Sequence, residues 1–173
     1  MSSIFDKAHA VKEATRILAQ FSITAPPVPV EKIAKQLGAI LQYAPLDDEL
    51  SGMAYVKDGH PIIGVNAMHH PNRQRFTIAH EIAHLVLHRD YITAQVHVDK
   101  AFTLKRDPVA ASGTDALEIE ANAFAAQLLM PADWVKQAFA TELELDDETA
   151  LSVVARKFRV STSAIQNRIM QMF

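Results

Sequence analysis

One uninterrupted segment, residues 72–88, restricts the fold of this chain more than any other because it contains the pattern His-Glu-x-x-His. The segment holds neither glycine nor proline, and Ile78, Ile82 and Leu85 recur at helical spacing, which predicts a largely buried helix. His80 and His84 then lie one turn apart on one face, with Cβ atoms about 5–6 Å from each other. We expect the rest of the chain to fold around this helix.

Two imidazoles at this separation can bind one metal ion, and zinc is a metal that imidazole suits. Glu81 lies about 100° around the helix from His80, so its carboxylate cannot easily join the same ion. The carboxylate can instead reach a metal-bound water molecule and remove its proton. The segment therefore predicts two metal ligands and a general base. The alternative interpretation is a pair of solvated or packed histidines without a metal.

A third protein ligand is expected because catalytic zinc sites normally use three such ligands and a water molecule. A second helix, predicted at residues 112–130, contains Glu118 and Glu120, which lie about 200° apart, so only one can face the metal. Glu118 shares its face with small and apolar residues, whereas Glu120 shares its face with Ala123 and Gln127, which indicates solvent exposure. Geometry thus favours Glu118 as the ligand over Glu120, and over an amphipathic core helix with two surface glutamates.

Asn122 follows Glu118 by one helical turn and is a candidate to support the metal site from outside. Its side chain can accept a hydrogen bond from the free ring N–H of a ligand histidine, which fixes the tautomer and the orientation of the ring. Alanines at positions 121, 125 and 126 would let the two helices approach closely.

The whole chain has the length and composition of one compact domain. It contains 173 residues, almost half of them hydrophobic, and no cysteine, which excludes cysteine-based zinc sites, thiol nucleophiles and disulfides. We find no apolar run of signal-peptide length near the N-terminus and no stretch of roughly 20 apolar residues. A cytoplasmic protein that does not contact membranes is therefore expected. A net charge of −3 gives no general reason to expect nucleic-acid binding.

The remaining segments predict a mixture of helices and strands. Residues 52–56 and 61–66, joined by a turn, are typical of a β-hairpin that directly precedes the histidine helix. This hairpin either provides an edge strand for an extended peptide substrate or is an ordinary half-buried hairpin. Other elements are expected at residues 4–21 (helix), 30–37 (helix, ended by Gly38), 39–43 (strand), 131–140 (helix), and 147–158 with 161–172 (a helix–turn–helix-like pair).

Two motifs together resemble a known family. Arg-Phe-Thr-Ile-Ala-His-Glu-Ile-Ala-His at residues 75–84 and Glu-x-x-Ala-Asn-x-Phe-Ala-x-x-Leu-Leu-Met-Pro, placed at residues 118–131, closely resemble the ImmA/IrrE family of metallo-endopeptidases. The resemblance extends upstream to residues 63–66 and downstream to residues 155–169. It implies an α+β fold with a zincin-like metalloprotease core, in which a small β-sheet packs against the His-Glu-x-x-His helix and a C-terminal helical pair follows. Residues 1–173 then form a single zinc peptidase-like domain, with residues 147–173 packed on it.

The resemblance also implies a gluzincin-like site with one zinc ion per chain. His80, His84 and Glu118 are the expected ligands, and Glu81 is the expected catalytic base. A tetrahedral oxyanion would need a further donor, for which His88, Tyr91 and His97 are candidates that the sequence does not separate. His88 could alternatively orient a carboxylate or be a partly buried polar residue.

Members of this family resemble cytoplasmic proteases that cleave or inactivate helix–turn–helix repressors, in mobile elements or stress responses, so a repressor is the expected protein partner. The larger radiation-response members carry an extra C-terminal sensor-like domain, which a chain ending at Phe173 is expected to lack. Two other functions remain open. One is a metal-bound protein that sequesters a repressor without cutting it. The other is a DNA-binding regulator built on the terminal helices, whose basic patch of Arg156, Lys157, Arg159 and Arg168 is small and adjoins an acidic segment, so direct nucleic-acid binding is disfavoured.

Overall fold

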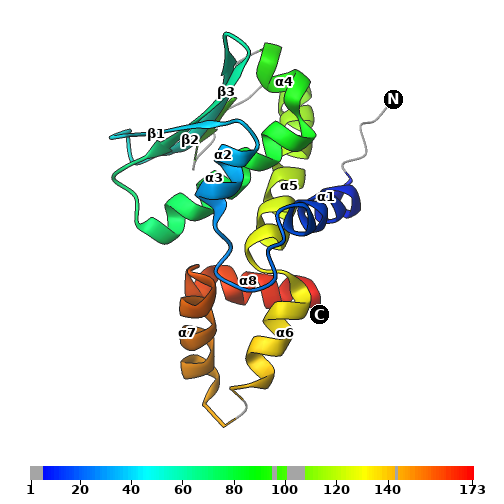
Figure 1. The fold of residues 1–173 in the computed structure, drawn as a ribbon, viewed down its shortest axis with the longest axis vertical. Coiled ribbons are helices and arrows are strands. Elements are labelled where there is room, and N and C mark those ends of the chain that lie inside the picture. Colours follow the sequence, from blue (N-terminus) through cyan, green and yellow to red (C-terminus); the bar gives the residue numbers. More distant parts are fainter. Residues whose placement is uncertain (1–5, 95–96, 101–107, 143) are drawn as a thin grey trace.

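A computed structural model describes residues 6–94, 97–100, 108–142 and 144–173, with side chains described outside residues 94–114. Within these ranges the chain is α+β, as the sequence predicts, with eight helices and one four-stranded sheet (Figure 1). The elements are α1 (Lys7–Gln20), α2 (Val30–Gln36), β1 (Ile40–Ala44), β2 (Leu50–Lys57), β3 (His60–Asn66), α3 (Pro71–Leu87), α4 (Arg89–Ala94), β4 (His97–Lys100), α5 (Pro108–Leu129), α6 (Ala132–Ala140), α7 (Asp147–Phe158) and α8 (Thr162–Met172).

The sheet has the strand order β1-β3-β2-β4. The predicted hairpin is formed by β2 and β3, which pair antiparallel around a turn where Asp58 and Gly59 both have positive φ angles, 51° and 77°. Positive φ at both central residues is the pattern of a type I′ turn, whose twist suits a hairpin. The interpretation of this hairpin as an edge is wrong, because β3 pairs on its other side with β1 and β2 pairs with β4. The edges of the described sheet are β1 and β4.

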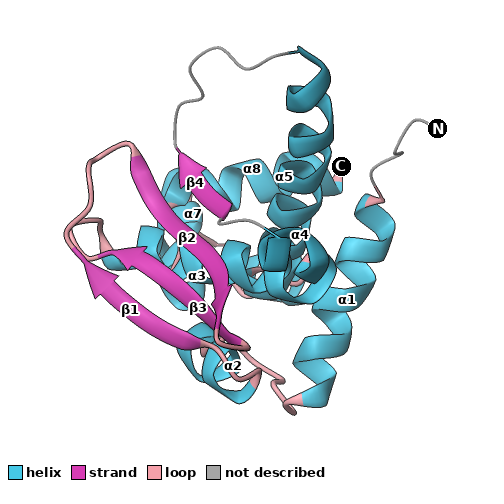
Figure 2. Cartoon of the chain, turned by 90° about the horizontal axis from the view of Figure 1, so that it is seen from above, coloured by secondary structure: helices cyan, strands magenta, loops and turns pink. Residues whose placement is uncertain are grey.

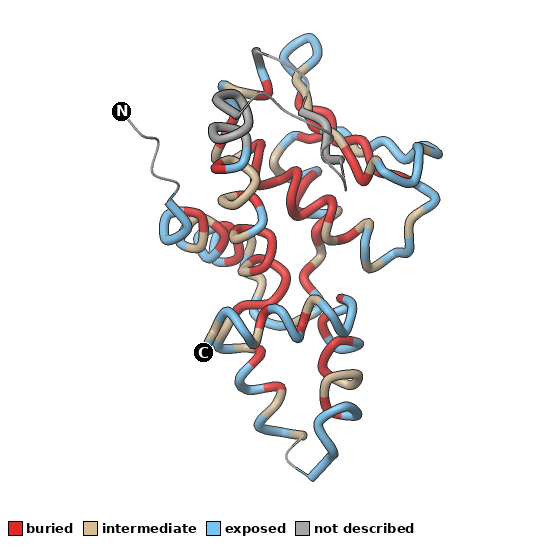
Figure 3. The backbone as a smooth tube through the Cα atoms, turned by 180° about the vertical axis from the view of Figure 1, so that it is seen from behind, coloured by how far each residue is buried: buried red, intermediate tan, exposed pale blue. Residues whose placement is uncertain are grey.

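Helix α3 lies between the sheet and α5 (Figure 2). Pro71 stands in the first turn, where a missing N–H costs nothing, and the His70 ring accepts from the backbone N–H of Asn72. From Thr77 to Leu85 every residue of α3 is buried, and the buried positions concentrate in the middle of the molecule (Figure 3). The helix is thus covered on all sides, as its apolar periodicity predicts.

Helix α5 packs against both α3 and α1 and therefore joins two layers of helices. Its start at Pro108 lies four residues before the start that the sequence predicts, while its end before Pro131 agrees with the prediction. Ala121, Ala125 and Ala126 are buried, which is consistent with a close approach of α5 to its neighbours. In the part of the chain that the structure describes, no helix is long and apolar enough to span a bilayer.

Helices α6, α7 and α8 form the lower part of the molecule in Figure 1. Buried arginine side chains join this part to the rest. Arg75 of α3 donates from Nε to the carbonyl of Arg159 at 3.2 Å and from Nη2 to the carbonyl of Val28 at 2.9 Å. Arg168 of α8 donates from Nε to the carbonyl of Met130 at 2.9 Å and also contacts the Gln127 side chain.

The assignment of Arg168 to a basic surface patch is wrong. Its residue surface is only 8% exposed, and its guanidinium serves the C-terminal end of α5 rather than solvent. The patch that would favour DNA binding therefore loses one of its four members.

Replacing Arg168 by methionine is expected to lower the free energy of unfolding by about 1–3 kcal/mol, because the Met130 carbonyl would stay buried without this donor. Urea denaturation of the purified variant measures this change. Arg156→Met is the matched control, because Arg156 is exposed on α7. Equal stability of the two variants would contradict the role given to Arg168.

Candidate metal centre

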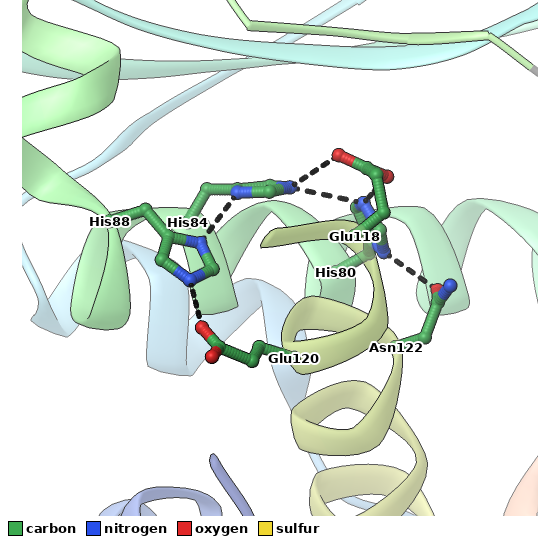
Figure 4. Close-up of polar contacts among 6 residues, drawn as sticks. All are labelled: His80, His84, His88, Glu118, Glu120 and Asn122. Carbon is green, nitrogen blue, oxygen red and sulfur yellow. Dashed lines mark hydrogen bonds and ion pairs between the residues drawn. The ribbon is translucent and has the colours of Figure 1, made fainter. Parts of the chain in front are cut away.

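Three potential metal ligands meet where α3 and α5 face each other (Figure 4). The Nε2 atoms of His80 and His84 lie 3.2 Å apart. The Glu118 carboxylate of α5 reaches both, with Oε2 at 3.1 Å from Nε2 of His80 and Oε1 at 3.3 Å from Nε2 of His84. The three residues each offer one ligand atom, and these three atoms all lie within 4.8 Å of one another. The structure therefore brings together the three residues that the sequence selects.

The second nitrogen of each of these two imidazoles has its own partner. Nδ1 of His80 lies 3.0 Å from the Asn122 side-chain oxygen, and Nδ1 of His84 lies 2.9 Å from Nδ1 of His88. An amide oxygen only accepts hydrogen bonds, so Nδ1 of His80 carries the proton and Nε2 of the neutral ring presents a lone pair. A lone-pair nitrogen, a second imidazole nitrogen and a carboxylate then converge at one point. That donor set fits a bound cation.

Electrostatics keeps Glu118 ionised at this point. Burial alone raises the pKa of its carboxyl, but the hydrogen bonds to His80 and His84, and the positive charge of those rings when protonated, outweigh burial. The net effect holds the pKa of Glu118 well below its ordinary value. The Glu118 carboxyl is therefore ionised beside these two imidazoles and offers a negatively charged oxygen ligand.

Glu81 lies on the sheet side of α3 and is completely buried. A Cβ atom built on Gly52 of β2 would lie 3.5 Å from Oε1 of Glu81 and only 2.4 Å from Cγ2 of Thr77. Any side chain at position 52 would therefore force β2 away from α3. The absence of a side chain at Gly52 lets the sheet close directly over the Glu81 carboxylate.

The other candidates from the sequence lie in different surroundings. His88, which caps the C-terminus of α3, is 7% exposed, and its Nε2 lies 2.8 Å from Oε2 of Glu120. Tyr91 belongs to α4 and packs, partly buried, against the hydrophobic core. His97 belongs to β4, and its side chain lies outside the described residues.

The expectation that Glu120 faces solvent is wrong. Its side chain is 19% exposed, and besides His88 it binds the backbone N–H of Asp6 through Oε1 at 2.7 Å. The N-terminal end of α1 covers this side of α5, which turns a surface position into a partly buried one. The sequence does contain a signal for this contact. His80, His84 and His88 recur at intervals of four residues, so a third histidine on the same helix face can pair with a second glutamate on α5.

The family model for peptidase M78, the IrrE N-terminal-like domain, matches residues 34–170. The chain belongs to this family. The residues matched to the peptidase M78 family include α3, α5 and every residue of the candidate metal centre. The family resemblance drawn from the two sequence motifs is thereby confirmed.

A solved structure described as a Mycobacterium tuberculosis transcriptional regulator has a similar fold. It superimposes with a TM-score of 0.61 at 19% sequence identity, over 91% of this chain and 45% of that chain. This peptidase M78 domain thus spans less than half the length of the regulator. The comparison with curated proteins gave no match.

Proposed function

We propose that this protein is a zinc-dependent endopeptidase that hydrolyses a peptide bond in a regulatory protein. The convergence of His80, His84 and Glu118 carries the proposal, because two imidazoles and one carboxylate are a ligand set typical of catalytic zinc. One zinc ion per chain would occupy this point. Residues 1–173 would act as a single peptidase-like domain on which the helical pair of residues 147–173 is packed.

The chain's own residues would then have separate tasks. A bound zinc ion supplies Lewis acidity, which polarises a carbonyl and lowers the pKa of coordinated water to about 7. Glu81 would accept the proton of the attacking water and deliver it to the leaving amine. Asn122 would hold the His80 ring with its Nε2 lone pair toward the ion, through the 3.0 Å contact to Nδ1.

Tyr91 and His97 are our two candidates for the hydrogen-bond donor to the tetrahedral oxyanion. His88 is a weaker candidate because both of its ring nitrogens face protein groups, His84 and Glu120. Its contacts favour the alternative that it orients a carboxylate.

A cytoplasmic helix–turn–helix repressor is the substrate class that we propose. The support is the resemblance to the ImmA/IrrE endopeptidases, together with a fold shared with a protein described as a transcriptional regulator. A peptidase requires a protein substrate, and a role in regulation makes a transcription factor the natural one.

The test is cleavage of purified helix–turn–helix repressors by the zinc-loaded protein, with products identified by mass spectrometry. Removing the metal with a chelator is expected to abolish cleavage, and adding zinc back should restore it, because the ligands alone cannot activate water. Cleavage that persists at full rate without metal would contradict the proposal. A repressor that is bound but stays intact would instead support sequestration.

A further inference from the structure

A continuous line of polar contacts leads from the candidate metal centre through α3 and α5 to the N-terminal end of α1. Nδ1 of His84 meets Nδ1 of His88 at 2.9 Å, Nε2 of His88 meets Oε2 of Glu120 at 2.8 Å, and Oε1 of Glu120 accepts from the backbone N–H of Asp6 at 2.7 Å. Figure 4 shows the first two of these contacts on the side of His84 that points away from Glu118. Beyond His84, no residue of this line belongs to the three-ligand set.

We propose that His88 and Glu120 are positioning residues that hold His84 in its metal-binding tautomer. The inference rests on the proposed metal function of His80, His84 and Glu118. It assigns no substrate contact to His88, which acts only through His84.

The direction of each hydrogen bond follows from the chemistry of His84 at one end of the line and of the Glu120 carboxylate at the other. To bind a metal through Nε2, His84 must carry its proton on Nδ1, which therefore donates to His88. Nδ1 of His88 must then be the acceptor, so its proton resides on Nε2. Nε2–H points at the Glu120 carboxylate, which only accepts. A single assignment of protons satisfies all three groups.

Burial makes this assignment matter. His84 is fully buried and His88 is 7% exposed, so water is a poor substitute for either partner. Without an acceptor at position 88, the neutral His84 ring would leave its Nδ1–H unsatisfied, and the tautomer with Nε2–H would become more favourable. That tautomer has no lone pair for the metal.

The rings of His80 and His84 are thus oriented by two different side chains of α5. His80 uses the Asn122 amide directly, whereas His84 reaches the Glu120 carboxylate through the ring of His88. A carboxylate behind a histidine increases the basicity of the ring and fixes its orientation. The Asp6 N–H in turn holds the Glu120 carboxylate from the start of α1.

Zinc affinity of position-88 variants tests the proposal. The affinity is measured by competition with a chromophoric chelator, and the ligand geometry by the visible spectrum of the cobalt-substituted protein. His88→Leu removes the acceptor and is expected to weaken zinc binding about 10- to 100-fold. His88→Asn keeps an acceptor oxygen near the place of Nδ1 and is expected to retain most of the affinity and the cobalt spectrum. His9→Asn, at an exposed position, is the matched control.

Glu120→Ala is expected to weaken binding less than His88→Leu, because it removes the second group of the line rather than the first. Long-range proton–nitrogen NMR of the metal-loaded wild type, which involves no substitution, should show His88 with its proton on Nε2. Thermal unfolding of the metal-free variants separates a loss of fold from a loss of metal affinity.

These measurements separate a failure of the positioning role from a failure of the proposed metal function. Unchanged affinity in His88→Leu, equal losses in His88→Asn and His88→Leu, or a proton on Nδ1 of His88 would overturn the positioning role alone. A wild type that binds no more zinc than Glu118→Ala would overturn the proposed metal function as well.

Discussion

Glu81→Gln is expected to slow peptide-bond hydrolysis by about 10²- to 10⁴-fold, the usual contribution of a general base. The amide has nearly the shape of the carboxylate but cannot accept the proton of the attacking water. Glu81 is fully buried beneath β2, so a replacement of equal size is required to keep the packing against Gly52. Cleavage of a repressor substrate, followed by gel and mass spectrometry, measures the effect.

Zinc content and repressor binding should be unchanged in Glu81→Gln, which separates the chemical step from both. Glu144→Gln is a suitable control because it makes the same change at an exposed position. If Glu81→Gln inactivates the repressor as well as the wild type does, inactivation occurs by sequestration and the endopeptidase proposal fails.

Glu118→Ala is expected to reduce the metal content from about one zinc per chain to a small fraction of that value. Two histidines alone would remain, and the negative charge that offsets the metal charge would be gone. Interactions with His80 and His84 hold the pKa of Glu118 well below its ordinary value, so the side chain that is removed is a carboxylate and not a neutral acid. Elemental analysis of the purified variant measures the loss.

Asp115→Ala provides the comparison, because Asp115 lies on the same helix and is exposed. It should retain the zinc of the wild type. Equal zinc in Asp115→Ala and Glu118→Ala would show that Glu118 is not a ligand and that α5 supplies no charge to the site.

The parts of the site that depend on a single helix could be predicted from the sequence. The spacing of His80 and His84 places both on one face of any helix. The angle between Glu118 and Glu120 on their own helix allows only one of them to face the metal. The apolar character around Glu118 then identifies which one joins His80 and His84. These inferences need only helical geometry and the local pattern, both of which the sequence contains.

Contacts among three or more elements could not be predicted in this way. Glu120 has a solvent-type pattern on α5 but becomes partly buried because Asp6, the N-cap of α1 and more than a hundred residues earlier, lies against it. Arginine is usually a surface residue, yet Arg168 of α8 donates a hydrogen bond to the Met130 carbonyl at the end of α5. The edges of the sheet likewise depend on β1 and β4, which pair with the hairpin from distant positions.

The placement of the ligands on two different helices links metal binding to the folding of the protein. His80 and His84 lie on α3, whereas Glu118, Asn122 and Glu120 all lie on α5. An ion shared by these helices would bind only while they are packed together, so it would stabilise the native state over any state in which they separate. At a free zinc concentration 1,000 times the dissociation constant, this linkage amounts to about 4 kcal/mol. The abundance of the folded protein would then depend on the zinc supply of the cell.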